Sequence, residues 1–180
     1  MGQLGRRGVM GGAVALLVAV ASVLEAQTPG VVDQNWLSWD PGTRTVHFKL
    51  TAGLTGLNGA LNFNGFRDGG LTLVVPAGSP MVVEFENHDG MLPHSAQVIL
   101  NMRPVPGAAM DQAAIARAYT DKVGEGLPPQ SKDRMRFTAT PAGEYLFFCG
   151  VPGHGLAGMW IRLSVSDTAR EPALLATPKS

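Results

Sequence analysis

Cysteine is nearly absent from this sequence: Cys149 is the only one among 180 residues, so no disulfide can form within one chain. This excludes the small secreted domains that are held together by paired cysteines. Lys and Arg together number 14, as do Asp and Glu, so the basic surplus that nucleic-acid binding needs is also missing. The composition predicts a protein of near-neutral charge without a nucleic-acid partner, and it leaves the single cysteine to be explained.

Long helical runs are also scarce, because 23 glycines and 13 prolines interrupt the chain. Short apolar–polar alternations recur between these residues, which is typical of the strands of an antiparallel sandwich. One exception is the alanine-rich segment 108–119, which predicts a short helix inserted before the last strands. The sequence therefore predicts an all-β sandwich with strands at Arg44–Leu50, Ala60–Phe63, Leu71–Val75, Met81–Glu86, Ser95–Leu100, Asp133–Thr138, Glu144–Cys149 and Met159–Val165.

The N-terminus has the pattern of an export signal. Arg6 and Arg7 precede an uncharged stretch from Gly8 to Leu24, and Ala26 offers a small residue for cleavage. The uncharged stretch is just long enough to cross a bilayer, so a retained membrane anchor is the alternative. We expect an exported protein, periplasmic or on the outer face of the cytoplasmic membrane. The expected division is a signal peptide or anchor at 1–26, a linker at 27–43, one domain at 44–166 and a flexible tail at 167–180.

The stretch CGVPGHGLAGMW explains the lone cysteine better than an inert buried thiol does. Four residues separate Cys149 from His154, and four more separate His154 from Met159. Thiolate and thioether are soft ligands that select copper, and two histidines, one cysteine and a weak methionine describe a blue-copper electron-transfer site. Structural zinc sites use four Cys or His ligands, so the methionine argues against zinc.

The second histidine of such a site must come from elsewhere in the chain. His94 is in phase with the apolar residues of its strand, whereas its rival, His88, lies in a turn. His88 and His47 are interpreted as surface residues. By strand phase, His94, Cys149 and Met159 all fall on the core face at strand ends, where they can converge. The predicted metal ligands are therefore His94, Cys149, His154 and Met159.

The order of a distant histidine followed by Cys-x4-His-x4-Met resembles the cupredoxins. Its motifs are most similar to those of sulfocyanin, and after that to those of rusticyanin. The segments that carry the resemblance are LNFNG at 61–65, LTLVVPAG at 71–78, LPHS at 92–95 and CGVPGHGLAGMW at 149–160. The resemblance spans about residues 45–165. It implies a Greek-key β-sandwich and one-electron transfer through one mononuclear type 1 copper. It also implies that His94, Cys149 and His154 are equatorial ligands and Met159 the axial one.

Residues around the predicted ligands suggest how the copper is tuned. The Ser95 N–H is expected to donate to the Cys149 thiolate, and the Ser95 hydroxyl to hold the ring of His94. Apolar neighbours disfavour the doubly charged ion. We therefore expect a raised reduction potential, based on Ser95, Met159, Phe85, Phe148 and Leu92.

These observations predict an electron carrier of an extracytoplasmic respiratory chain. It would act as a monomer and meet a redox partner, a cytochrome or a terminal oxidase, at an apolar patch around His154. It is not expected to be an enzyme, because a copper with four protein ligands has no open position for substrate. A catalytic copper enzyme would need further histidine clusters. The remaining alternative is a copper chaperone or storage protein. The eight methionines suggest it, although they are scattered along the chain.

Overall fold

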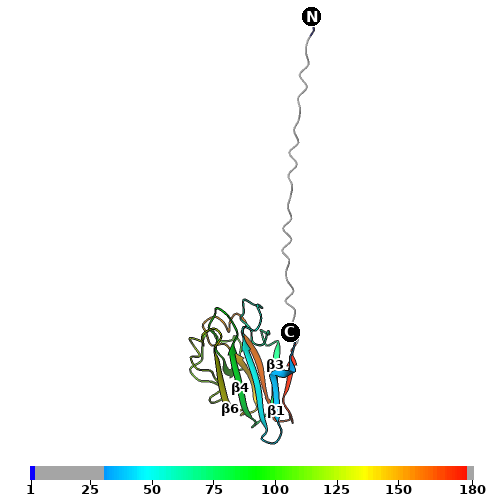
Figure 1. Ribbon diagram of the computed structural model, residues 1–180, viewed down its shortest axis with the longest axis vertical. Helices are drawn as coiled ribbons and strands as arrows, with labels where there is room; N and C mark the ends of the chain where they lie inside the picture. Colours follow the sequence, from blue (N-terminus) through cyan, green and yellow to red (C-terminus); the bar gives the residue numbers. More distant parts are fainter. Residues whose placement is uncertain (3–30, 178–180) are drawn as a thin grey trace.

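The computed structural model describes residues 1–2 and 31–177, and its strands form two sheets (Figure 1). The first sheet has the order β1-β2-β4-β6 and the second the order β5-β7-β8-β3-β9. This confirms the predicted all-β sandwich. The elements are a short 3-10 helix η1 (Gln34–Trp36) and the strands β1 (Leu37–Asp40), β2 (Thr45–Ala52), β3 (Leu71–Pro76), β4 (Pro80–Asn87), β5 (Gln97–Leu100), β6 (Lys132–Thr138), β7 (Gly143–Phe148), β8 (Trp160–Ser166) and β9 (Ala173–Ala176).

The core lies between the two sheets, as the alternation of apolar residues predicts. Strand β2 alternates buried and less buried positions along its length, and β4 does the same. Phe48 of β2 meets Phe147 of β7 with ring centroids 6.1 Å apart, which joins the two sheets directly. Every second side chain of an amphipathic strand faces the core, so this alternation gives each sheet an apolar face that packs against the other sheet.

Three of the sequence expectations are corrected by the structure. Residues 60–63 run irregularly between two turns, with an isolated bridge at Phe63 instead of a strand. The left-handed backbone of Asn58, Ala60 and Asn64 accounts for this, because a strand cannot accommodate positive φ values. Residues 37–40 of the expected linker form β1, which pairs with β2, and residues 173–176 of the expected tail form β9, which pairs with β3.

The expected helix at 108–119 is also wrong, since the segment consists of bends and turns. Its backbone bonds to the edge strand β5 instead: the Ala114 N–H donates to the Val98 carbonyl, and the Val98 N–H donates to the Ala118 carbonyl, each at 2.8 Å. An open strand edge leaves N–H and C=O groups unpaired. Covering that edge therefore outweighs the helix propensity of the alanines.

The predicted signal peptide or anchor lies outside the described residues, apart from Met1 and Gly2. Within residues 1–2 and 31–177, no helix is both long and apolar enough to cross a bilayer.

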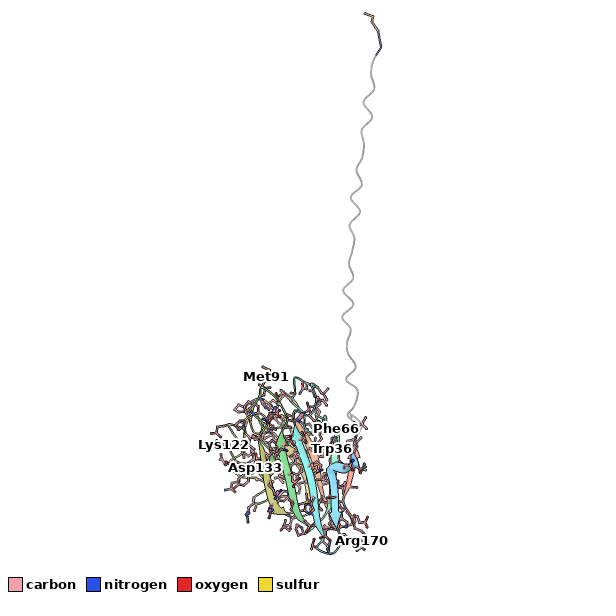
Figure 2. The ribbon with its side chains drawn as sticks, in the orientation of Figure 1. Trp36, Phe66, Met91, Lys122, Asp133 and Arg170 are labelled. Carbon is pink, nitrogen blue, oxygen red and sulfur yellow. The ribbon has the colours of Figure 1, made fainter. Side chains whose placement is uncertain are left out.

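The strand pairing brings the predicted ligand segments to one end of the second sheet. Strands β7 and β8 are antiparallel neighbours, with Phe148 opposite Trp160, so the residues 149–159 form the loop that joins them. Strand β5 pairs with β7 with Gln97 opposite Phe148, so the segment before β5, which carries His94, lies at the same end. Met91 projects from this end of the domain, and Arg170 lies at the other (Figure 2).

Candidate metal centre

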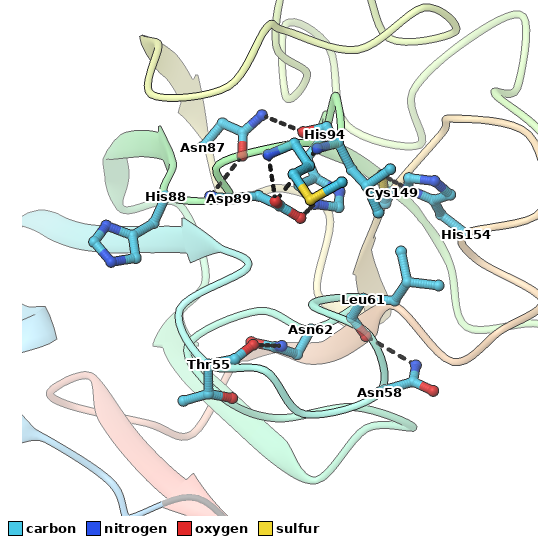
Figure 3. A network of polar contacts seen from close by, with 12 residues as sticks. Thr55, Asn58, Leu61, Asn62, Asn87, His88, Asp89, His94, Cys149 and His154 are labelled. Carbon is cyan, nitrogen blue, oxygen red and sulfur yellow. Dashed lines mark hydrogen bonds and ion pairs between the residues drawn. The ribbon is translucent and has the colours of Figure 1, made fainter.

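Three of the four predicted ligands meet at this end of the sandwich. One ligand atom each from His94, Cys149 and His154 lies within 4.8 Å of the other two. The Cys149 Sγ is 3.5 Å from His154 Nδ1, and the two imidazole ring centroids are 5.1 Å apart. Figure 3 shows these side chains pointing toward one another from two separate loops. The sequence thus predicted a set of residues that the fold brings together across 55 to 60 positions of chain.

Cys149 is fully buried at the end of β7. Burial raises the pKa of its thiol, and the N–H groups of Ser95 and Val151 oppose that rise. The Ser95 N–H lies 3.5 Å from Sγ, as the sequence predicts. The Ser95 hydroxyl does not hold the histidine ring: it donates to the Val123 carbonyl at 2.7 Å and accepts the Gly150 N–H at 3.0 Å. Ser95 therefore fastens the first residue of the ligand loop to the His94 segment.

His94 is held by a carboxylate that the sequence analysis did not single out. Its Nε2 lies 3.0 Å from Asp89 Oδ2, and both side chains are buried. A carboxylate accepts hydrogen bonds, so Nε2 carries the proton and Nδ1 presents its lone pair. Nδ1 is buried and has no partner in the described part of the chain. Burial lowers the pKa of His94, although Asp89 opposes this effect. The ring is therefore neutral and offers Nδ1 as a ligand atom.

His154 is half-buried in the loop between β7 and β8. Burial is the main cause that lowers the pKa of His154, to about 4. The backbone N–H of His154 donates to the Val151 carbonyl at 3.1 Å, which closes a tight turn around Pro152 and Gly153. A neutral imidazole is the form that binds metals, and His154 keeps this form in mildly acidic solution.

Met159 is fully buried at the far end of the same loop. Its N–H donates to the His154 carbonyl at 3.0 Å, and its carbonyl accepts the Cys149 N–H at 3.1 Å. The backbone thus places Met159 beside the cysteine and the histidine of the loop, and the role of its thioether as axial ligand stays a prediction.

A second segment fastens the Met159 end of the loop and was not predicted. The Asn58 amide donates to the Ala157 carbonyl at 2.7 Å, and Arg67 donates to the Asn58 side chain at 2.9 Å. The Asp68 N–H also donates to the Gly158 carbonyl at 2.9 Å. These residues lie within and just after the turns that replace the expected strand 60–63. The turns therefore hold the ligand loop from outside.

The two remaining histidines lie apart from this cluster. His47 and His88 are both exposed. Figure 3 shows the His88 ring directed away from His94, although only five residues separate them in sequence. Among the described residues, the cluster of potential metal ligands consists of His94, Cys149 and His154.

Comparison with known proteins decides the family. The model of the sulfocyanin (SoxE) domain matches residues 32–176. This chain belongs to the sulfocyanin family. It is a cupredoxin most similar to sulfocyanin, as its motifs predicted. The sulfocyanin of Sulfolobus acidocaldarius is 30% identical over 119 residues, which cover 62% of this chain and 58% of that protein. The match thus spans little more than half the length of that sulfocyanin.

Solved structures of rusticyanin resemble this sulfocyanin-family domain. Rusticyanin from Thiobacillus ferrooxidans aligns with a TM-score of 0.51 and 28% identity, covering 68% of this chain and 77% of that one. Reduced rusticyanin aligns with the same TM-score and identity, covering 68% and 79%. Rusticyanin is described as a copper protein.

The residues of this sulfocyanin-family chain fit a copper ion. His94 Nδ1 is buried, and its lone pair accepts no hydrogen bond within the described protein. The Cys149 sulfur accepts an N–H hydrogen bond that stabilises a thiolate. One thiolate and two imidazoles form a soft donor set that suits copper. His94, Cys149 and His154 therefore form a candidate copper site.

The lowered histidine pKa predicts how the metal-free protein responds to acid. Between about pH 6.5 and pH 4 the unfolded chain protonates His154 while the folded chain does not, so the folded state binds fewer protons and its stability falls as pH falls. We expect the free energy of unfolding of metal-free protein to decrease across this window, as measured by chemical denaturation. His154→Gln should flatten part of the slope, and an unchanged slope in that variant would show that His154 titrates normally.

Proposed function

We propose that this protein carries single electrons through one type 1 copper held by His94, Cys149, His154 and, axially, Met159. The observation that carries the proposal is the buried Cys149 sulfur that lies with two imidazole nitrogens inside 4.8 Å. When bound, copper supplies a one-electron couple. The similarity to rusticyanin, a copper protein, and the match to the sulfocyanin family support this assignment. A Greek-key connectivity is part of this proposal, since both sheets place strands side by side that are not consecutive in sequence, such as β2 with β4 and β3 with β8.

The role of the chain is to keep the ligand atoms in place while the charge of the centre changes. Ser95 fastens the Cys149 end of the loop, and Asn58 with Arg67 fastens the Met159 end. Asp89 fastens His94. A loop held at both ends needs little rearrangement when an electron enters or leaves, and this favours rapid transfer.

We propose that electrons pass at the His154 edge, because exposed apolar side chains come from both histidine-bearing segments. Met91, three residues before His94, is 85% exposed, and Leu156 in the ligand loop is 64% exposed. We take these side chains as part of the proposed docking surface, because contiguous exposed apolar patches mark protein interaction sites. The partner is proposed to be a cytochrome or a terminal oxidase of an extracytoplasmic respiratory chain. The carrier itself is proposed to be an exported monomer without an enzymatic activity of its own.

The alternative proposal, a copper chaperone or store, is less well supported. Cys149 and His94 are fully buried, and Met159 is too. A protein that hands copper on needs donors that an acceptor can reach, whereas these donors are enclosed by the sandwich and its loops.

A redox cycle distinguishes the two functions. The electron-carrier proposal expects copper-loaded protein to take up and release one electron per copper reversibly, with the metal retained in both states. Absorption and metal content should be followed through repeated titration with reductant and oxidant. Loss of copper in one oxidation state would favour the chaperone or storage function and overturn the electron carrier.

A charge at Leu156 should weaken docking without altering the metal centre. We expect Leu156→Asp to reduce the second-order rate of electron transfer to the partner by about fivefold or more, because burying a charge in an apolar interface costs about 1 kcal/mol or more. The visible spectrum should not change. Leu100 is the matched control, since it is 55% exposed but lies at the far end of β5. Equal rates in wild-type protein and Leu156→Asp would remove this surface from the account.

A further inference from the structure

Asp89 connects the buried His94 to the exposed loop that follows it. Its Oδ2 lies 3.0 Å from His94 Nε2, while its Oδ1 accepts the Met91 N–H at 2.8 Å and the Leu92 N–H at 3.3 Å. Two of the three contacts bring a backbone N–H donor to Oδ1, and the third brings a ring nitrogen of His94 to Oδ2. This pattern satisfies an ionised carboxylate, which accepts hydrogen bonds and donates none.

The carboxylate is enclosed and has no basic residue beside it. Asp89 is 8% exposed. In the described residues, the ion pairs of Lys and Arg involve Asp68, Glu84 and Glu86, and the one charged-group contact of Asp89 is the His94 ring. A buried charge that no cation neutralises acts over a longer range than an exposed one, because solvent and salt screen it less. The His94 ring, and whatever Nδ1 binds, lies in that field.

The backbone around Asp89 fixes its position. The Asp89 N–H donates to the Asn87 side chain at 3.1 Å, and the Gln130 amide donates to the Asp89 carbonyl at 3.2 Å. Gly53, at φ +66°, lies so close that a Cβ there would be 2.9 Å from the Asp89 Cβ. These contacts fix the backbone of Asp89, and the N–H groups of Met91 and Leu92 hold its carboxylate toward His94.

We propose that Asp89 is a positioning residue that sets the reduction potential of the copper centre. It holds His94 in the tautomer that presents Nδ1, and its uncompensated negative charge favours Cu(II) over Cu(I). This proposal rests on the proposed copper function. The Asp89 charge acts against the rise in reduction potential that is expected from Ser95, Met159 and the apolar surroundings. The copper centre is therefore less oxidising than those residues alone would make it.

Replacing the charge tests the proposal. Asp89→Asn keeps the shape of the side chain but removes its charge, so the reduction potential should rise. The expected change is about tenfold in the ratio of Cu(I) to Cu(II) affinity, which is about 59 mV for one electron. Asp89→Glu keeps the charge and should stay close to wild-type protein. Both potentials are measured by voltammetry on copper-loaded protein.

Asp68→Asn is the matched control. Asp68 also lies against the ligand loop, but its carboxylate pairs with Arg67 at 2.8 Å and its side chain is 38% exposed. Removing this compensated, solvated charge should shift the potential much less. A shift in Asp89→Asn that is no larger than that in Asp68→Asn, or an equal rise in Asp89→Glu, would overturn the role of the Asp89 charge.

A second readout needs neither copper nor a variant that folds. Nitrogen-resolved NMR of the histidines in metal-free wild-type protein should show His94 with the proton on Nε2 and a bare Nδ1. The opposite tautomer would overturn the positioning role. If wild-type protein takes up no copper, the proposed function and the potential-setting role both fail, while the tautomer still decides whether Asp89 orients His94.

Discussion

Cys149→Ser is expected to abolish the intense visible absorption of the copper-loaded protein. The colour of a blue-copper site depends on its cysteine thiolate, and a serine hydroxyl at this position is neither soft nor ionised. Copper affinity should fall by more than about 100-fold, beyond what the loss of an outer-sphere partner costs. Absorption spectroscopy during copper titration measures both effects, with circular dichroism to check that the fold is intact.

The histidines supply the control for this prediction. His88 lies six positions before His94 and is exposed, whereas His94 is buried beside the Cys149 sulfur. His88→Ala should therefore keep the colour and His94→Ala should lose it. Full colour in Cys149→Ser, or equal behaviour of the two histidine variants, would contradict the assignment of the site.

Gly155→Ala is expected to destabilise the ligand loop although it adds one methyl group only. A Cβ at Gly155 would lie 2.5 and 2.6 Å from ring carbons of Phe148 and 3.0 Å from the Pro106 carbonyl oxygen. Phe148 is fully buried in a small cluster with Ile99, Val105, Leu146 and Trp160, so its ring has little room to move. Overpacking of this kind costs about 1–3 kcal/mol. The free energy of unfolding of metal-free protein should fall by that amount.

The change should also reach the metal site, because Gly155 directly follows His154. We expect weaker copper binding and altered paramagnetic resonance in the loaded variant. Gly90→Ala is the control, since Gly90 lies beside Asp89 but a Cβ there meets nothing within 4 Å. If Gly155→Ala were as stable as Gly90→Ala, the tight packing of the ligand loop against Phe148 would be disproved.

The sandwich could be predicted from the sequence because its long strands alternate over many residues. β2 and β4 each run for eight residues, and their pattern is clear. The short strands β1 and β9 have four residues each and depend on their neighbours for pairing. The segment 108–119 was predicted as a helix because helix propensity depends on the local sequence alone. The β5 edge that the segment covers exists only in the folded chain, so the sequence pattern does not reveal it.

The candidate site divides in the same way. Cys149 and His154 could be predicted to lie together because the loop sets their spacing, and His94 because strand phase puts it on the core face. The role of Met159 as a ligand stays a prediction. Asp89 carries no such pattern, since any turn accommodates an aspartate. Asn58 lies 99 residues from Ala157, so only the folded chain reveals their hydrogen bond. The candidate ligands form a motif in the sequence, whereas the residues that orient them are recognised by their proximity in the folded chain.

Paramagnetic resonance of Cu(II)-loaded wild-type protein, recorded together with its visible spectrum, tests the central claim most directly. A Cys149 thiolate bound to copper predicts intense blue or green colour and narrow copper hyperfine splitting. A colourless protein with wide splitting, or one without a copper signal, would mean that Cys149 is not a ligand and that this domain does not carry electrons through a type 1 copper.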